Sequence, residues 1–342
     1  MDKKYYAMAI LLCLILLVSA CAKRSGAATG SAPKTPFLGG TAGLTINFEK
    51  DSPPPEVTDD ESFGFNVIVK LKNDGEFSIP RDRVSLNLVG FDPNDFGRSF
   101  EDLRDVKPDD DLQAKRRDAE GNIVDGTTTF AQFPKGGGDF IPSKFPGNTP
   151  FTFRADVCYN YETEAITKVC ILRDMINIRD DSICRPTAVG TTGRQIYSSS
   201  APVQVVNFRQ SVVGKDKISF TFDIVRSFGN VDVFWSKDKR VPTSFDEGCP
   251  KDPKARRAVE NNVGVEITEI PTDPIFSNLK CGGLDTGSTG VVRLVDGRRT
   301  ITCTVELTTD RLDLEKNIGI KLQYNVLDTK ETQVLVKHLT ET

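Results

Sequence analysis

A short apolar segment near the N-terminus, ending in residues 17–21 (LVSAC), constrains this chain more than any other stretch. Lys3 and Lys4 precede the apolar run, and the run ends in small residues, which is the layout of a secretory signal. The run is shorter than the about 20 apolar residues that a transmembrane helix needs. We therefore expect residues 1–20 to be a signal peptide, with an uncleaved membrane anchor as the alternative.

Residues 17–21 also resemble a lipobox, the motif of lipoprotein precursors in which a cysteine follows a small residue. Val18 stands where leucine is commoner. The resemblance implies that Cys21 becomes the lipidated first residue of the mature protein. The protein would then be lipid-anchored on the cell membrane, facing the extracellular space or the cell envelope. Cleavage without lipidation is a further alternative.

The expected mature chain is acidic and contains one histidine. Removing residues 1–20 changes the formal net charge from −4 to −5, which argues against a nucleic-acid partner and against electrostatic binding to anionic lipid. His338 is the single histidine. The chain therefore has almost no residues for His-based acid–base catalysis or for a serine or cysteine triad. We expect no enzymatic activity, cofactor or metal. The 48 Asp and Glu residues keep a carboxylate-based hydrolase open as an alternative.

Six cysteines follow Cys21, and an even number in an exported protein predicts disulfide bonds. A zinc site is the alternative, but the sequence has no CxxC pair and no histidine close to any of the six. The candidates are Cys158, Cys170, Cys184, Cys249, Cys281 and Cys303.

The phase of the cysteines within alternating strands predicts how they pair. Cys158 and Cys170 fall opposite the core residues of a hairpin expected around residues 159–164, so we predict an exposed cross-strand bond between them. Cys303 shares the inward phase of its strand, which predicts a buried bond with Cys281, its nearest partner. By elimination, the remaining two cysteines would pair between domains.

Apolar and polar residues alternate along most of the chain, and no segment has the period of an amphipathic helix. The clearest strand is residues 62–72, followed by a turn at residues 73–75 (NDG). Further turns are expected at Asp296-Gly297, which would join residues 291–295 and 298–308 as a hairpin, and at residues 328–330. This pattern predicts an all-β fold, and the length predicts two Ig-like β-sandwich domains. The expected organisation is a signal peptide (1–20), a flexible tether (21–38), and domains at 39–200 and 201–342.

Residues 91–148 interrupt the strand pattern and are rich in Asp, Gly, Pro and Arg, so we expect a long functional or disordered loop. Two acidic strings in it, residues 92–97 and 109–111, offer oxygen ligands for calcium. The first string lacks the glutamate that an EF-hand requires at its twelfth position. We interpret the two strings as a turn and a solvated acidic run.

Three local strings, at residues 39–44 (GGTAGL), 65–76 and 157–165, resemble a group of uncharacterised archaeal cell-surface lipoproteins. They are also similar to the broader class of Ig-like adhesion modules. The resemblance covers most of residues 39–210 and a thinner part of the second domain. It implies a β-sandwich fold and a surface location, and it supplies no catalytic residues.

These features predict a membrane-anchored surface lipoprotein with a structural, adhesion or envelope-assembly role, acting through contacts with other surface or envelope proteins. At the tip of the expected hairpin, Tyr159 and Tyr161 are possible binding residues, with packing back onto the sheet as the alternative. The alternative function is an extracellular small-ligand or carbohydrate-binding lipoprotein associated with a transporter. Such sites usually gather several aromatic residues, and this chain has one tryptophan and six tyrosines.

Overall fold

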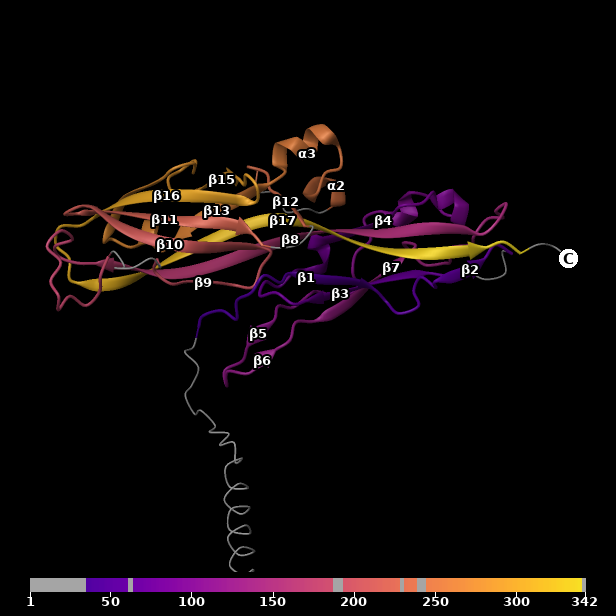
Figure 1. The fold of residues 1–342 in the computed structure, drawn as a ribbon, viewed down its shortest axis with the longest axis horizontal. Coiled ribbons are helices and arrows are strands. Elements are labelled where there is room, and N and C mark those ends of the chain that lie inside the picture. Colours follow the sequence, from indigo (N-terminus) through magenta and orange to yellow (C-terminus); the bar gives the residue numbers. More distant parts are fainter. Residues whose placement is uncertain (1–34, 61–63, 187–192, 228–230, 239–243, 340–342) are drawn as a thin grey trace, which may run out of the picture. The chain divides into compact units, whose positions relative to one another are not determined.

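The computed structural model of the chain describes residues 35–60, 64–186, 193–227, 231–238 and 244–339 (Figure 1). The expected signal peptide, Cys21 and most of the expected tether lie outside the described residues, so they remain predictions. From residue 36 onward the chain forms one compact unit.

The fold is all-β, as the alternation predicts, with half of the residues in strands and 8% in helices. An eight-stranded sheet follows the order β15-β13-β17-β8-β4, with β12 and β2 added on β17 and β9 on β8. Its strands are β2 (Glu56–Thr58), β4 (Val84–Val89), β8 (Thr149–Ile171), β9 (Ile196–Ser198), β12 (Asp232–Phe234), β13 (Asn262–Thr268), β15 (Thr289–Arg293) and β17 (Leu314–Lys337).

Two smaller sheets pack against this large one. The three-stranded sheet has the order β1-β3-β7, and the four-stranded sheet has the order β10-β11-β16-β14. Their strands are β1 (Leu44–Phe48), β3 (Val67–Asn73), β7 (Thr128–Phe133), β10 (Val203–Gly214), β11 (Lys217–Arg226), β14 (Phe276–Cys281) and β16 (Arg298–Leu307). A two-stranded hairpin, β5 (Arg116–Arg117) with β6 (Ile123–Val124), and two short helices, α2 (Phe245–Gly248) and α3 (Pro253–Val259), complete these elements.

Strands β8 and β17 are the long axis of the fold. They pair antiparallel without a break from Ile171↔Leu314 to Thr149↔Val336. The expected hairpin at residues 159–164 is therefore wrong, as is an expected turn at residues 328–330. Neither segment contains glycine or proline, and the alternation passes through both without a change of phase, so nothing in them stops a strand.

The long strands carry two sandwich halves, which Figure 1 shows at their opposite ends. In the first half (residues 36–157 and 328–339), the β1-β3-β7 sheet packs on β4 and the adjoining ends of β8 and β17. In the second half (residues 158–327), the β10-β11-β16-β14 sheet packs on the rest of β8 and β17 and on β13. One continuous hydrophobic core runs through both halves.

The chain passes between the halves inside β8 and inside β17. The expected domain boundary at residue 200/201 falls between β9 and β10, which both belong to the second half. The second half is thus an insertion between two segments of the first half.

Residues 91–148 contain ordered structure that the composition did not suggest. They include β7, the β5–β6 hairpin and two short 3₁₀ helices, at Pro93–Phe96 and Glu101–Leu103. Phe96 and Phe140 are fully buried and contact Phe153 of β8, with ring centroids 5.4 and 6.1 Å away. Much of the expected loop is therefore part of the first-half core.

Candidate functional site

All six candidate cysteines form disulfides, and Cys281–Cys303 is bonded as predicted. The other two predicted pairs are wrong. Cys158 bonds to Cys249, and Cys170 bonds to Cys184. Because the expected hairpin is absent, Cys158 and Cys170 lie twelve positions apart on one strand, which separates them by roughly 40 Å and excludes a bond.

The predicted exposure of Cys158 and Cys170 is also wrong. The outward phase of Cys158 is right, whereas Cys170 belongs to the main hydrophobic core. Cys158 lies on the outer face of β8, but a second small core covers it, formed with Phe234, Phe245, Cys249 and Leu327 beneath α2. The Cys158 and Cys170 side chains are 1% and 0% exposed. A face opposite the main core can thus be buried by a later segment of the chain.

Tyr159 and Tyr161 are not at a hairpin tip; both are buried on the inward face of β8. Burial raises the pKa of the Tyr161 hydroxyl, which donates a hydrogen bond of 2.8 Å to the carbonyl of Ser200. Tyr324 of β17 lies beside Tyr161, with ring centroids 6.1 Å apart. The alternative, that these tyrosines pack onto the sheet, is therefore correct, and neither is open to a ligand.

The acidic strings of residues 92–97 and 109–111 close turns. Asp92 accepts a hydrogen bond of 3.0 Å from the amide of Asn94 at the start of a 3₁₀ helix. Asp111 accepts one of 2.8 Å from the amide of Arg81. Across the described part of the chain, no three His, Cys, Asp or Glu side chains are grouped as metal ligands.

His338 fixes the C-terminal end of β17. Its Nδ1 lies 2.8 Å from the buried carboxylate of Asp59, which also accepts hydrogen bonds from the amides of Phe145 and Leu339. These contacts, that of Phe145 above all, hold the pKa of Asp59 well below its usual range. The single histidine therefore joins segments that are distant in sequence.

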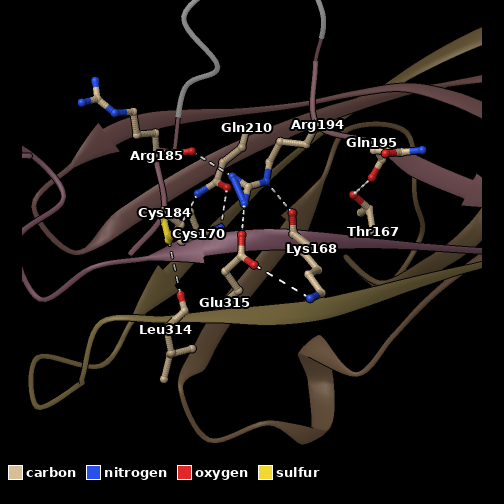
Figure 2. A network of polar contacts seen from close by, with 10 residues as sticks. All are labelled: Thr167, Lys168, Cys170, Cys184, Arg185, Arg194, Gln195, Gln210, Leu314 and Glu315. Atoms are coloured by element: carbon tan, nitrogen blue, oxygen red, sulfur yellow. Dashed lines mark hydrogen bonds and ion pairs between the residues drawn. A yellow bond between two sulfur atoms is a disulfide. The ribbon is translucent and has the colours of Figure 1, made fainter. Parts of the chain in front are cut away.

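The lateral edge of β8 in the second half carries the polar network of Figure 2. Strand β9 pairs only with Ala165–Thr167, which leaves the following backbone without a strand partner on that side. The buried side-chain amide of Gln210 takes the place of a partner strand. It donates a hydrogen bond to the carbonyl of Cys170 at 2.7 Å and accepts one from the backbone N–H of Cys170 at 2.8 Å. These are the two bonds that a neighbouring antiparallel strand would make.

Arg194 completes the network. It donates hydrogen bonds to the carbonyls of Lys168 and Arg185 at 2.6 and 2.8 Å, and to the carboxylate of Glu315 at 2.7 Å. Together with the Cys170–Cys184 disulfide, these contacts hold the Arg185 and Arg194 segments on the edge (Figure 2). The edge is therefore closed to pairing with another strand.

The loops at the end of the second half are fixed by Arg311, whose side chain is fully buried. Its guanidinium donates to the carbonyls of Leu172, Arg173, Thr308 and Lys215, and to the carboxylate of Asp216 at 2.7 Å. We call residues 172–185, 213–216 and 308–313 the end loops.

The end loops expose apolar side chains although their bases are fixed. Ile176, Ile183 and Leu312 are 61%, 63% and 66% exposed, and Ile178 and Val213 are also exposed. Beside them a hollow of about 710 Å³ includes Asn177, Arg179 and Leu312 in its lining. These five exposed side chains of the end loops, which the sequence pattern did not indicate, are the candidate contact surface.

No protein-family model and no curated protein matches this chain. Among solved structures, the chain is similar to the CupB6 tip adhesin from Pseudomonas aeruginosa, with 10% sequence identity over 86% of this chain and 98% of that one, and a TM-score of 0.13. At that score the similarity carries no argument about fold or function. Within the described ranges, no helix is long and apolar enough to cross a membrane.

Proposed function

We propose that this protein is a non-enzymatic surface lipoprotein, anchored through Cys21, with a structural, adhesion or envelope-assembly role through contacts with other surface or envelope proteins. The resemblance of residues 17–21 to a lipobox supports the anchor. The composition of residues 22–36, mostly Ala, Gly, Ser, Thr and Pro, supports a tether, which when extended reaches about 50 Å from the membrane.

The observation that carries the proposal is the exposure of five apolar side chains on the end loops. Apolar side chains fill the centres of protein interfaces, whereas a solvated loop gains nothing from exposing three isoleucines within residues 176–183. Arg311 and the Cys170–Cys184 disulfide already fix the bases of these loops. Binding would therefore cost little additional conformational entropy.

The experiment compares two equally exposed positions in cells that make the full chain. A photo-crosslinking residue replaces either Ile183 or Val295, which are both 63% exposed. Val295 lies in a turn at the other end of β11, where the amide of Arg226 bonds the carbonyl of Gly297. We expect a discrete adduct with an envelope protein from position 183 only.

A second arm replaces Cys21 with serine in the same cells. We expect the variant to leave the detergent-soluble membrane fraction and to lose the adduct at position 183. Adducts of equal yield from both positions, or none from position 183, would refute the proposed contact surface. Unchanged membrane partitioning and mass of the Cys21→Ser variant would refute the anchor.

A further inference from the structure

The Cys281–Cys303 disulfide differs from the other two because it joins neighbouring strands of one sheet. Its two cysteines face each other directly in the antiparallel register of β14 and β16. The other two bonds each join β8 to a residue outside any strand. We infer that the Cys281–Cys303 bond is a redox-sensitive switch that holds the edge strand β14 on its sheet.

The register places a constraint on this bond. Directly opposed residues of an antiparallel pair have Cβ atoms about 4.5–5.5 Å apart, whereas a disulfide prefers about 3.8 Å between its Cβ atoms. A bond across the ladder therefore has to draw the two strands together, and a disulfide under such a constraint is more easily reduced. A residue outside any strand can move toward its partner, so the other two bonds carry no such constraint.

Exposure alone does not distinguish this bond from Cys170–Cys184. Cys281 is 7% exposed and Cys303 is fully buried, while Cys184 is 9% exposed and Cys170 is fully buried. Each bond thus has one slightly accessible cysteine. The backbone at Cys170 is also held by the two hydrogen bonds of Gln210. A faster reduction of the Cys281–Cys303 bond would therefore report on the strands that it joins and not on its exposure.

The reductant is a dithiol. Its thiolate attacks Sγ of Cys281, the more exposed of the two cysteines, the S–S bond breaks, and Cys303 leaves as a thiolate that takes up a proton. The second thiol of the reductant then attacks the mixed disulfide. This step frees the Cys281 thiol and converts the dithiol to its own disulfide, so two electrons pass from the reductant to the protein.

Strand β14 depends on this bond because little else holds it. It lies at the edge of the four-stranded sheet, where within the described part of the chain it pairs with β16 alone. Its register shifts between Ser277 and Lys280, and its buried residues are Phe276 and Cys281 at its two ends. Elements with few buried contacts open at a low free-energy cost. Reduction should therefore release β14 and leave β16 with an open edge.

The first test follows the order in which the disulfides open. The full chain in detergent, with its free thiols blocked, is treated with dithiothreitol without denaturant, and samples are alkylated over time. Mass spectrometry of peptides then measures the labelling of each cysteine. We expect Cys281 and Cys303 to be labelled about tenfold faster than Cys170 and Cys184. Equal rates, or the reverse order, would overturn the inference.

Hydrogen exchange tests whether the bond acts as a switch. After selective reduction, exchange should rise in residues 276–290 and not in β10 or β11, and oxidised glutathione should restore protection. The variant Cys281→Ser/Cys303→Ser should show the reduced pattern without reductant, whereas the matched variant Cys170→Ser/Cys184→Ser should keep β14 protected. Unchanged exchange in β14 after reduction of the wild type would overturn the switch, whether or not the variants fold. None of these results bears on the Cys21 anchor or on the contacts of the end loops.

Discussion

The two halves of the molecule share β8 and β17 but hold their long connections in different ways. The first half buries its connections with aromatic rings, and the second half fixes them with covalent bonds and charged groups. The first-half cluster consists of Phe65, Phe91, Phe96, Phe140, Phe151 and Phe153. All six disulfide-bonded cysteines belong to the second half.

This difference follows from where the apolar side chains are. The connection at residues 91–148 carries phenylalanines that reach the core, so packing alone orders it. In the connection between β8 and β9, the described residues 172–186 and 193–195 point three isoleucines outward, and Cys184, Arg194 and Arg311 hold them in place. A loop that keeps its apolar groups on the surface needs fixation of another kind.

The largest effect should come from removing the Cys158–Cys249 bond. Its cysteines are 91 residues apart, and the chain-entropy model gives about 4–5 kcal/mol for a loop of that length. The double variant Cys158→Ala/Cys249→Ala should lose about that much free energy of unfolding in urea. Cys170→Ala/Cys184→Ala, with a separation of 14, should lose only about 3 kcal/mol. The reverse order would show that loop closure does not dominate.

The variant Phe153→Ala tests how much the aromatic core stabilises the first half. Phe153 is fully buried and contacts four other phenylalanine rings, and truncating such a residue costs about 3–5 kcal/mol. Hydrogen exchange should rise first in residues 64–157 and not in β10, β11 or β16. Mild reduction of the wild type should produce the opposite pattern. The same exchange pattern in both experiments would mean that the halves unfold as one unit.

Arg311→Met should cost about 3 kcal/mol, because it leaves four carbonyls and Asp216 without their donor. Arg311→Lys is the control: it keeps the charge but has three donors in place of five, so it should lose roughly half as much. Urea denaturation of both variants measures this. Equal losses would show that the planar shape of the guanidinium, and not its charge, fixes the end loops.

The smallest effect concerns Asp328, where β17 passes between the halves. Burial raises the pKa of Asp328 above its ordinary value. A carboxyl with a higher pKa in the folded state destabilises the protein as pH rises through that pKa. Asp328→Asn should therefore gain stability at pH 7 and not at about pH 3, by less than about 1 kcal/mol because the side chain is partly exposed. Thermal unfolding at the two pH values measures it, and a gain of equal size at both would assign the effect to packing.

The alternation of residues predicted strand positions and faces well. The inward phase of Val157 and the outward phase of Cys158 are correct, as is the buried Cys281–Cys303 bond. Alternation cannot show where a strand ends. For this reason the sequence pattern predicted two strands and a turn in place of β8, and again in place of β17. The turn at Asp296-Gly297 is correct, with positive φ at both residues, but only an isolated bridge flanks it because β15 and β16 enter different sheets.

The candidate site was harder to predict because its groups are brought together by the fold. The role of Gln210 could have been predicted from the sequence. It occupies the inward phase of β10 beside Phe208, where a polar side chain must find a buried hydrogen-bond partner. The role of Arg311 could not have been predicted in this way, since most of its acceptors are backbone carbonyls, which every residue possesses. The exposure of Ile176 and Ile183 depends on where the loop lies, which composition does not encode.

The insertion of the second half within the first has a consequence for the order of synthesis. Domains that follow one another along a chain can fold one after another, the N-terminal one first, as the chain emerges. Here the first half lacks residues 328–337 of its large sheet until the whole second half has been translated. The N-terminal half should therefore be the last to be completed, and a chain truncated anywhere before residue 328 should leave that half open to proteases.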